Sequence, residues 1–340
     1  MTYGIEPKRI LAVDGGGSKT IAWIANAFPI GNGSNVELEV LGRGFAGPSN
    51  PRSVGFDIAF LNLTAAIAMA RKQTTDVSPR SEFTPFAVAC LSLAGAGRID
   101  EQNHVREWAD GQRLATQTLV VDDVEPLRLA AMYEQNSGHS AHTATAASWE
   151  QSVTLVVGTG SIACGRNGEY RSARVGGWGY LLGDEGSGFA IGLAGLQAVC
   201  KSHDRGEQLT PFQLAMLKAI GINTPTELVG FVYQNPLPRA QVATLSEIVI
   251  GSASSDSIAA KILEDSIQAM ADLISTTACR LELGHLSYSL ALSGGVVCNH
   301  SEIVAELLQR LEQSRLAPVT HHLVRDPIHG PLLMAARHVA

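Results

Sequence analysis

The stretch Val13-Asp14-Gly15-Gly16-Gly17-Ser18-Lys19-Thr20 lies between two apolar runs. This order predicts a strand, a glycine turn and a second strand. Successive glycines let backbone N–H groups come close to an anion, an approach that a Cβ atom would block. Ser18 and Thr20 add hydroxyl donors and Lys19 adds a charge, whereas Asp14 would repel a phosphate unless a divalent cation lay between them. The turn is therefore a candidate phosphate site, although the residues alone also fit a plain glycine hairpin.

A second copy of this pattern occurs in the other half of the chain. The apolar run Ser152–Val157 leads into Gly158-Thr159-Gly160-Ser161, and another strand-like run follows. A repeat of such long period predicts two similar domains that face each other. The first copy is neither a Walker A loop nor G-x-G-x-x-G. Two phosphate-binding hairpins are the arrangement of the sugar kinase, Hsp70 and actin superfamily. We expect an α/β chain of two ribonuclease-H-like domains, an actin-like ATPase fold, with a cleft between them.

Composition narrows the class of protein. The 340 residues are 45% hydrophobic and 17% charged with 34 glycines, which is typical of a two-domain α/β enzyme. The net charge is −7 and no basic run exceeds Arg71-Lys72, so we expect no nucleic-acid or membrane partner. The first nine residues lack the apolar core of a secretion signal, and we expect a cytoplasmic protein.

The cysteines and histidines predict no structural metal or disulfide. The five cysteines are an odd number without a Cys-x-x-Cys pair, and four lie in apolar contexts that predict small buried thiols in a reducing compartment. The adjacent His321 and His322 lie on a predicted strand and would point to opposite faces. The usual spacing of structural metal ligands is not found.

The order of elements predicts the domain limits. We expect an N-terminal domain over 1–133, a linker or insertion over 134–150, and a C-terminal domain over 151–340 whose last helix, about 330–340, packs back on the first domain. Ser53 is a predicted N-cap of a helix that runs to Lys72. One face of this helix would carry Val54, Ile58, Leu61, Ala65 and Ala68.

Other elements follow from periodicity and turn residues. Strands are expected over 9–14, 19–25, 36–42, 86–93, 118–121, 288–292 and 319–324. A glycine- and proline-rich loop is expected over 44–51. Helices are expected over 102–114, 126–133, 189–201, 211–220, 226–232, 239–250, 257–283, 302–313 and 330–338.

The segment 176–188 is a second candidate for chemistry. Its 13 residues include six glycines, yet it also holds Trp178 and the adjacent carboxylates of Asp184 and Glu185. Such a loop is costly to order, which favours a functional interpretation. We expect Asp184 and Glu185 to meet hydroxyl groups of a ligand and Trp178 to contact the apolar face of a sugar.

These motifs resemble those of the N-acetylglucosamine kinase / BadF/BadG/BcrA/BcrD ATPase family. The resemblance rests on Asp14–Thr20, Gly158–Ser161, Gly177-Trp178-Gly179 followed by Gly183–Ser187, and Ser293-Gly294-Gly295-Val296. They occur in the family's order and cover essentially the whole chain. The resemblance implies ATP and Mg²⁺ as cofactors, a small sugar as substrate and an alcohol group as acceptor. We also expect a homodimer.

The resemblance assigns roles to both hairpins and to the late glycine pair. The two hairpins would hold the ATP phosphates through Gly15, Gly16, Gly17, Ser18, Lys19 and Thr20 and through Gly158, Thr159, Gly160 and Ser161. Gly294 and Gly295 would border the adenosine. Asp14 would hold Mg²⁺ through water.

A carboxylate is needed to accept the proton of the sugar hydroxyl. The family places an Asp between an N-domain strand and a helix, and here both Asp122 and Asp123 follow the strand. We prefer Asp123 because Asp-Val then leads into the helix as the family's Asp-Ala does. An ordinary N-cap is the alternative role for either residue.

The acceptor sugar is left open by two departures from the family. Asn50 matches its sugar-binding loop and Asp184 its sugar-hydroxyl carboxylate, although a loop Asn also fits a simple turn. The aromatic residue after Asn50 is absent, and Ala94 replaces a family serine. We expect a kinase of N-acetylglucosamine or glucosamine that forms the 6-phosphate. The alternative is an ATPase activator of a dehydratase or benzoyl-CoA reductase, which would need cysteines for an iron–sulfur cluster.

Overall fold

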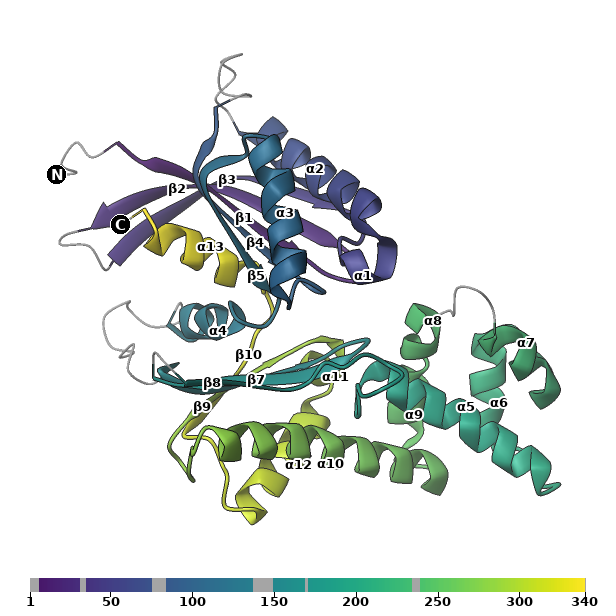
Figure 1. The fold of residues 1–340 in the computed structure, drawn as a ribbon. Coiled ribbons are helices and arrows are strands. Elements are labelled where there is room, and N and C mark those ends of the chain that lie inside the picture. Colours follow the sequence, from purple (N-terminus) through teal and green to yellow (C-terminus); the bar gives the residue numbers. More distant parts are fainter. Residues whose placement is uncertain are drawn as a thin grey trace. The chain divides into compact units, whose positions relative to one another are not determined.

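A computed structural model describes residues 6–30, 35–74, 84–136, 149–168, 171–233 and 239–339 (Figure 1). The chain folds into two compact units. Unit 1 comprises residues 1–143 and 326–340, and unit 2 comprises 144–325. Residues 137–148 of the predicted linker lie outside the described residues. Unit 1 is therefore discontinuous in sequence, because its last helix follows the whole of unit 2.

Unit 1 is built on a mixed five-stranded sheet in the order β3-β2-β1-β4-β5. Its strands are β1 (Lys8–Gly15), β2 (Thr20–Ile30), β3 (Asn35–Ala46), β4 (Phe86–Leu93) and β5 (Ala115–Asp122). The first three form an antiparallel meander, while β1, β4 and β5 run parallel. The carboxyl ends of three neighbouring strands therefore meet at one edge of this sheet.

Helices cover both faces of the unit 1 sheet (Figure 1). The helices are α1 (Pro51–Val54), α2 (Phe56–Gln73), α3 (Ile99–Gly111), α4 (Leu127–Asn136) and α13 (His329–Arg337). One apolar cluster joins α2 and α3 to one face of the sheet. A second cluster joins α13 to Ile10, Ala12, Val88 and Cys90 on the other face. The C-terminal helix thus completes the core of unit 1.

The buried face of α2 differs from the predicted one. Ile58 and Leu61 are 51% and 68% exposed, whereas the buried residues are Ala59, Leu63, Ala66, Ile67 and Ala70. The reason lies in β3, where a Cβ at Gly44 would be 1.9 Å from Ala66 O. Glycines in β3 let the helix backbone approach the sheet, so small side chains face inward and larger ones face solvent.

Unit 2 repeats the same sheet. Its strands are β6 (Gln151–Val157), β7 (Ser161–Asn167), β8 (Arg171–Gly176), β9 (Ser289–Ser293) and β10 (Thr320–Leu323). The order is β10-β9-β6-β7-β8, with an antiparallel meander β6–β8 and parallel strands β6, β9 and β10. Read from its meander, this is the order of unit 1, as the duplicated hairpin predicts.

The helices of unit 2 form a larger core with its sheet. They are α5 (Gly188–Asp204), α6 (Pro211–Ala219), the 3₁₀ turn η3 (Pro225–Glu227), α7 (Leu228–Val232), α8 (Arg239–Thr244), α9 (Ser246–Ser252), α10 (Ser257–Arg280), α11 (Gly295–Cys298) and α12 (Ser301–Gln313). No helix in the described parts of the chain is both long and apolar enough to span a membrane.

Several local predictions are corrected by the structure. Strand β8 is not predicted by the sequence, and β3 continues to Ala46, into the predicted loop. Asn50 rather than Ser53 caps the helix, which breaks at Gly55 into α1 and α2. A second predicted helix divides at Leu245 into α8 and α9.

The cysteines are also more exposed than predicted. Only Cys90 is buried, while Cys200 and Cys279 are exposed and the other two are intermediate. All five are among the described residues, and none of them forms a disulfide there. Cys200 follows the buried Val199 in α5 and Cys279 follows the buried Ala278 in α10, but both cysteines lie off the buried face of their helix, so apolar neighbours in the sequence did not indicate burial.

Candidate functional site

The carboxyl edge of the unit 1 sheet gathers most of the predicted site residues of this half. Asp14 pairs with Ser92 across β1 and β4, and Leu93 pairs with Asp122 across β4 and β5. Ala94 N–H, just after β4, donates to Gly15 O at 2.8 Å. The glycine hairpin, the turn after β4 and the Asp122-Asp123 pair therefore lie along one edge. In open α/β sheets this edge is where ligands bind.

The glycine hairpin leaves its backbone accessible. Strand pairing ends at Gly15 and Thr20, so residues 16–19 form the loop. Gly16 N–H donates to Lys19 O at 2.9 Å. A Cβ at Gly15 would lie 2.2 Å from Ser49 Oγ, whereas a Cβ at Gly17 would meet nothing. Close packing against Ser49 requires glycine at position 15. The open space at Gly17 suits the close approach of an anion.

Asp14 stands beside this loop at the end of β1 and is partly buried. Burial raises the pKa of its carboxyl group from 3.8 to about 6, and the charge of Lys19 opposes part of that rise. A partly dehydrated carboxylate is stabilised by a nearby cation. Mg²⁺ prefers oxygen ligands and keeps several of its waters, so this carboxyl group fits a magnesium ion held through water.

The loop that carries Asn50 is fastened to the hairpin. The backbone N–H groups of Ser49 and Asn50 donate to Gly16 O at 3.1 and 3.2 Å. Thr20 and Ser49 are fully buried. The Thr20 hydroxyl donates to Gly47 O at 2.6 Å and lies 2.8 Å from Ser49 Oγ. Thr20 therefore holds the loop in place, and the phosphate contact expected of it stays a prediction.

Asn50 lies next to the turn that follows β4. Its side-chain oxygen accepts the N–H of Arg52 at 3.0 Å and caps α1. A Cβ at Gly95, whose φ is +85°, would lie 2.3 Å from that oxygen. Only glycine permits this approach, so the two segments pack at the same sheet edge.

Asp122 and Asp123 follow each other where β5 ends. Asp122 Oδ1 accepts the N–H groups of Val124 and Glu125 at 3.1 and 2.8 Å. Asp122 O lies 3.3 Å from the Ser92 hydroxyl, which donates to it. The Asp122 carboxylate thus organises the turn before α4. The partly buried Asp123 is the next residue along this edge.

The corresponding edge of unit 2 carries the second hairpin and the late glycine pair. Gly158 N–H donates to Gly160 O at 2.9 Å, and the first turn of α5 closes on this loop through Gly188 N–H to Gly158 O at 2.8 Å. Gly294 has a φ of +97°, and a Cβ there would lie 2.3 Å from Val157 O. The predicted phosphate and adenosine segments are therefore adjacent within unit 2.

Asp184 is buried under the second hairpin. It is 4% exposed and accepts the N–H of Ser161 at 3.3 Å. A Cβ at Gly160 would lie 2.9 Å from its carboxylate. Burial raises the pKa of Asp184, while the Ser161 N–H and the charge of Arg239 oppose the rise. The Ser161 hydroxyl donates to Glu185 O at 2.7 Å. Both residues therefore hold the 176–188 loop to the hairpin, and the hydroxyl and phosphate contacts expected of them stay predictions.

Trp178 and Glu185 are exposed. Trp178 is 70% exposed and shares its loop with the exposed Leu181 and Leu182. Glu185 lines a groove of about 630 Å³ between α5 and α10. The adjacent carboxylates of Asp184 and Glu185 thus lie in different environments.

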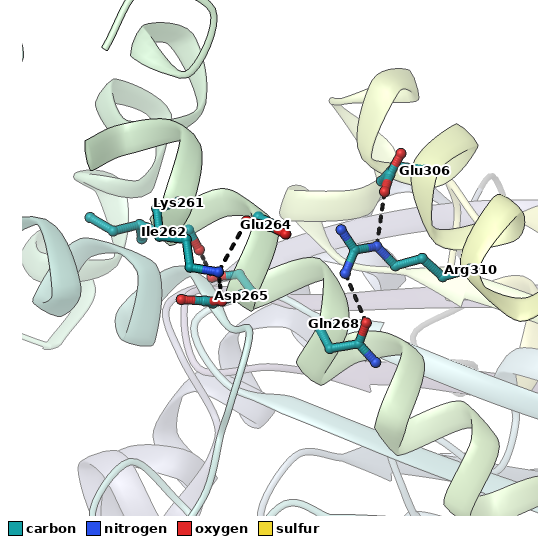
Figure 2. A network of polar contacts seen from close by, with 8 residues as sticks. Lys261, Ile262, Glu264, Asp265, Gln268, Glu306 and Arg310 are labelled. Carbon is teal, nitrogen blue, oxygen red and sulfur yellow. Dashed lines mark hydrogen bonds and ion pairs between the residues drawn. The ribbon is translucent and has the colours of Figure 1, made fainter. Parts of the chain in front are cut away.

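The same groove has a polar rim. Lys261 and Asp265 of α10 line it, and Lys261 contacts Glu264 and Asp265 at 3.1 and 2.9 Å (Figure 2). Beside them, Arg310 of α12 donates to Gln268 of α10 at 2.8 Å. These ion pairs are exposed and contribute little to stability.

Two residues of the site are not predicted by the sequence. Ser49 joins the hairpin to the Asn50 loop, as described above. Arg239 lies over the ring of Tyr180 at 4.4 Å, and its charge opposes part of the rise that burial causes in the pKa of Asp184. Both act on partners far away in sequence, so no local motif marks them.

The chain belongs to the BadF/BadG/BcrA/BcrD ATPase family, whose model matches residues 11–335. An N-acetylmuramic acid/N-acetylglucosamine kinase of Clostridium acetobutylicum is 27% identical over 329 residues, which cover 96% of this chain and 98% of the relative. An N-acetyl-D-glucosamine kinase of Dictyostelium discoideum is 28% identical over 336 residues, 96% of this chain and 97% of the relative.

A crystal structure from Chromobacterium violaceum has a similar fold. That protein, described as a candidate N-acetylglucosamine kinase, superposes with a TM-score of 0.70 at 20% identity, and the match covers 96% of this chain and 99% of the other. The predicted family and the predicted actin-like fold of two α/β halves are thereby confirmed.

Proposed function

We propose that this chain is an ATP-dependent kinase that phosphorylates N-acetylglucosamine or glucosamine at the 6-hydroxyl. The observation that carries the proposal is the sheet edge of unit 1, which brings together Asp14, the hairpin loop 16–19, Asn50 and Asp123. The names of the two relatives that match nearly the whole chain support a sugar kinase. The fold alone would not distinguish among the substrates of such kinases.

Nucleotide binding falls to the backbone of both hairpins. Backbone N–H groups of residues 15–18 and 158–160, with the Thr159 hydroxyl, hold the phosphates, and Gly294-Gly295 borders the adenosine. Asp14 would hold Mg²⁺ through water, and the ion would supply positive charge to neutralise the phosphates. Thr20 and Ser161 support the loops instead, because the protein already engages their hydroxyls.

The sugar is bound by Asn50 and Trp178, and its reacting hydroxyl transfers a proton to Asp123. Asp123 is the preferred base because Asp-Val leads into α4 as the family's Asp-Ala does, and two backbone N–H groups engage Asp122 in the turn before that helix. The sugar contacts expected of Asp184 and Glu185 stay predictions, since Asp184 is buried and Glu185 lines the groove between α5 and α10.

An ADP-release screen tests the proposal. Purified protein is supplied with Mg-ATP and one of N-acetylglucosamine, glucosamine, N-acetylmuramic acid or glucose, together with a sugar-free blank. We expect release that depends on an amino sugar, and phosphorus-coupled NMR of the product should show the 6-phosphate. High release in the blank that no sugar changes would contradict a kinase and favour the ATPase activator, which iron analysis would then test. Light scattering tests the expected homodimer.

A further inference from the structure

Three potential metal ligands of unit 1 lie together where α4 meets the start of α13. Ligand atoms of Glu134, Asp326 and His329 are all within 4.8 Å of one another. Glu134 is near the end of α4, while Asp326 and His329 belong to the segment that begins α13. Glu134 and Asp326 are 192 residues apart in the sequence, so no local motif indicates the group.

One ligand pair of the group has the spacing of a small coordination sphere. His329 Nδ1 lies 3.5 Å from Glu134 Oε1. In a tetrahedral Zn²⁺ site with bonds of about 2.0–2.2 Å, neighbouring ligand atoms are about 3.3–3.6 Å apart. The N–H of Asp326 donates to the same Oε1 at 3.0 Å. A carboxylate oxygen has a second lone pair, and such hydrogen bonds commonly orient metal ligands.

The imidazole ring of His329 is held with one nitrogen unsatisfied. Its Nδ1 is buried and has no hydrogen-bond partner among the described residues. The ring packs edge-on to Trp23 at 5.3 Å and against Tyr133 at 4.9 Å. A buried polar atom without a partner costs free energy, and a ring fixed by two aromatic neighbours is already oriented for a ligand.

We infer that Glu134, Asp326 and His329 bind a divalent cation of the zinc type. One imidazole and two carboxylates suit Zn²⁺ better than Mg²⁺ or Ca²⁺, which prefer oxygen ligands alone. The first turn of α13 has partial positive charge that opposes a cation, and the two carboxylates offset it. A water would complete a tetrahedral site.

The position of this site gives it a structural consequence. The chain leaves unit 1 shortly after Glu134 and returns to it at Asp326. A bound cation would therefore fasten the outgoing helix α4 to the returning helix α13 within unit 1. The alternative occupant is a proton on His329, which would then form an ion pair with Glu134 and need no metal.

Zinc binding to metal-stripped, nucleotide-free protein tests the inference. We expect one equivalent of Zn²⁺ by calorimetry and a higher unfolding temperature, with no comparable effect of Mg²⁺ alone. Asp326→Asn and His329→Gln should weaken zinc binding at least about tenfold. His285→Gln, which removes a partly exposed histidine of unit 2 near Glu312, is the matched control and should bind zinc normally. Co²⁺ should give visible d–d bands without thiolate charge transfer, because no cysteine is in the group.

Three results would each overturn the inference. The first is wild-type protein that takes up no zinc, the second is equal zinc binding by wild type and both variants, and the third is a thiolate band with Co²⁺. Asp326→Asn protects against misreading a folding defect, since it keeps the backbone bond to Glu134. This variant should match the wild type in circular dichroism and in unfolding temperature without metal.

Discussion

The carboxylate of Asp122 stabilises the turn before α4, where two backbone N–H groups donate to its Oδ1. Asparagine offers an amide oxygen in the same place, so Asp122→Asn should retain the turn. We expect its kcat to stay within about threefold of the wild type, since a peripheral change of about 0.6 kcal/mol corresponds to that factor. Steady-state kinetics with saturating sugar provide the measurement and the control for the next variant.

Asp123→Asn removes the proposed base while keeping its shape. General-base catalysis contributes roughly 10²–10⁴-fold, so kcat should fall by at least about two orders of magnitude. The KM for ATP should change little, because a base for the sugar hydroxyl need not touch the nucleotide in the ground state. Exchanged phenotypes of the two variants would move the base to Asp122. Full activity of both would refute an aspartate base at this edge.

Asp14 should destabilise the nucleotide-free protein when it is ionised. Its pKa is raised by burial from 3.8 to about 6, so the folded state binds this proton more tightly than the unfolded state. The penalty is fully present above about pH 6 and vanishes below about pH 4. Asp14→Asn should therefore stabilise the free protein by up to about 3 kcal/mol at pH 8, and by little at pH 4. Urea unfolding at the two pH values measures the difference.

The same variant should lose kinase activity and the stabilisation that Mg-ATP gives the wild type. A gain in stability combined with a loss of function is the expected mark of a strained functional residue. If Asp14→Asn is no more stable than the wild type at pH 8, the burial penalty is already offset within the protein, and the argument for a cation beside Asp14 fails.

At the scale of elements, the β1–β2 hairpin and the Asn50 loop act as one part. Thr20→Val would leave Gly47 O and Ser49 Oγ without their buried partner, at a cost of about 1–3 kcal/mol. We expect a higher KM for the sugar as well, because Asn50 follows this loop. Thr20→Ser keeps the hydroxyl and should lie close to the wild type in urea unfolding and in KM. Equal defects in both variants would show that the methyl group of Thr20, not its hydroxyl, matters.

The packing of α2 on β3 depends on a backbone contact. Gly44→Ala places a Cβ where Ala66 O already lies, and overpacking of this kind costs about 1–3 kcal/mol or more. Gly111→Ala is the matched control, because a Cβ there meets nothing and alanine suits a helix better than glycine. Denaturant unfolding should therefore separate the two variants by at least about 2 kcal/mol. Similar stabilities would mean that α2 shifts outward at little cost.

How far the sequence predicts these elements depends on where the deciding contact lies. Both glycine hairpins and their duplicated sheets follow from local patterns of apolar and turn residues. The buried face of α2 does not follow from such patterns, because glycines in β3 determine which side of the helix packs on the sheet. Asp184 fits a ligand carboxylate by motif, yet its contact with Gly160 buries it. The group of Glu134, Asp326 and His329 is not predictable from local sequence either, because the whole of unit 2 lies in the sequence between Glu134 and the other two residues.

At the scale of the whole molecule, the sequence of unit 2 is inserted between two segments of unit 1. Unit 2 is continuous over 144–325, whereas unit 1 needs residues 326–340 as well. Helix α13, yellow in Figure 1, covers the purple strands of unit 1 through Leu332, Ala335 and Ala336. Without these residues the apolar face that includes Ile10 and Val88 would be exposed to water, a loss that a unit of this size tolerates poorly. Unit 1 should therefore be completed last as the chain is synthesised.

A chain truncated after Arg325 tests this dependence. We expect limited proteolysis to spare 144–325, whose sheet and helices are complete, and to cleave 1–143 readily, with the cut sites identified by mass spectrometry. Full-length Leu332→Ala is the milder companion, because removing this buried side chain should cost about 2–5 kcal/mol. Leu214→Ala, at a 53% exposed position in α6, controls for the substitution itself. Equal protection of both units in the truncated chain would show that α13 is dispensable, since the first 143 residues would then form a stable core without it.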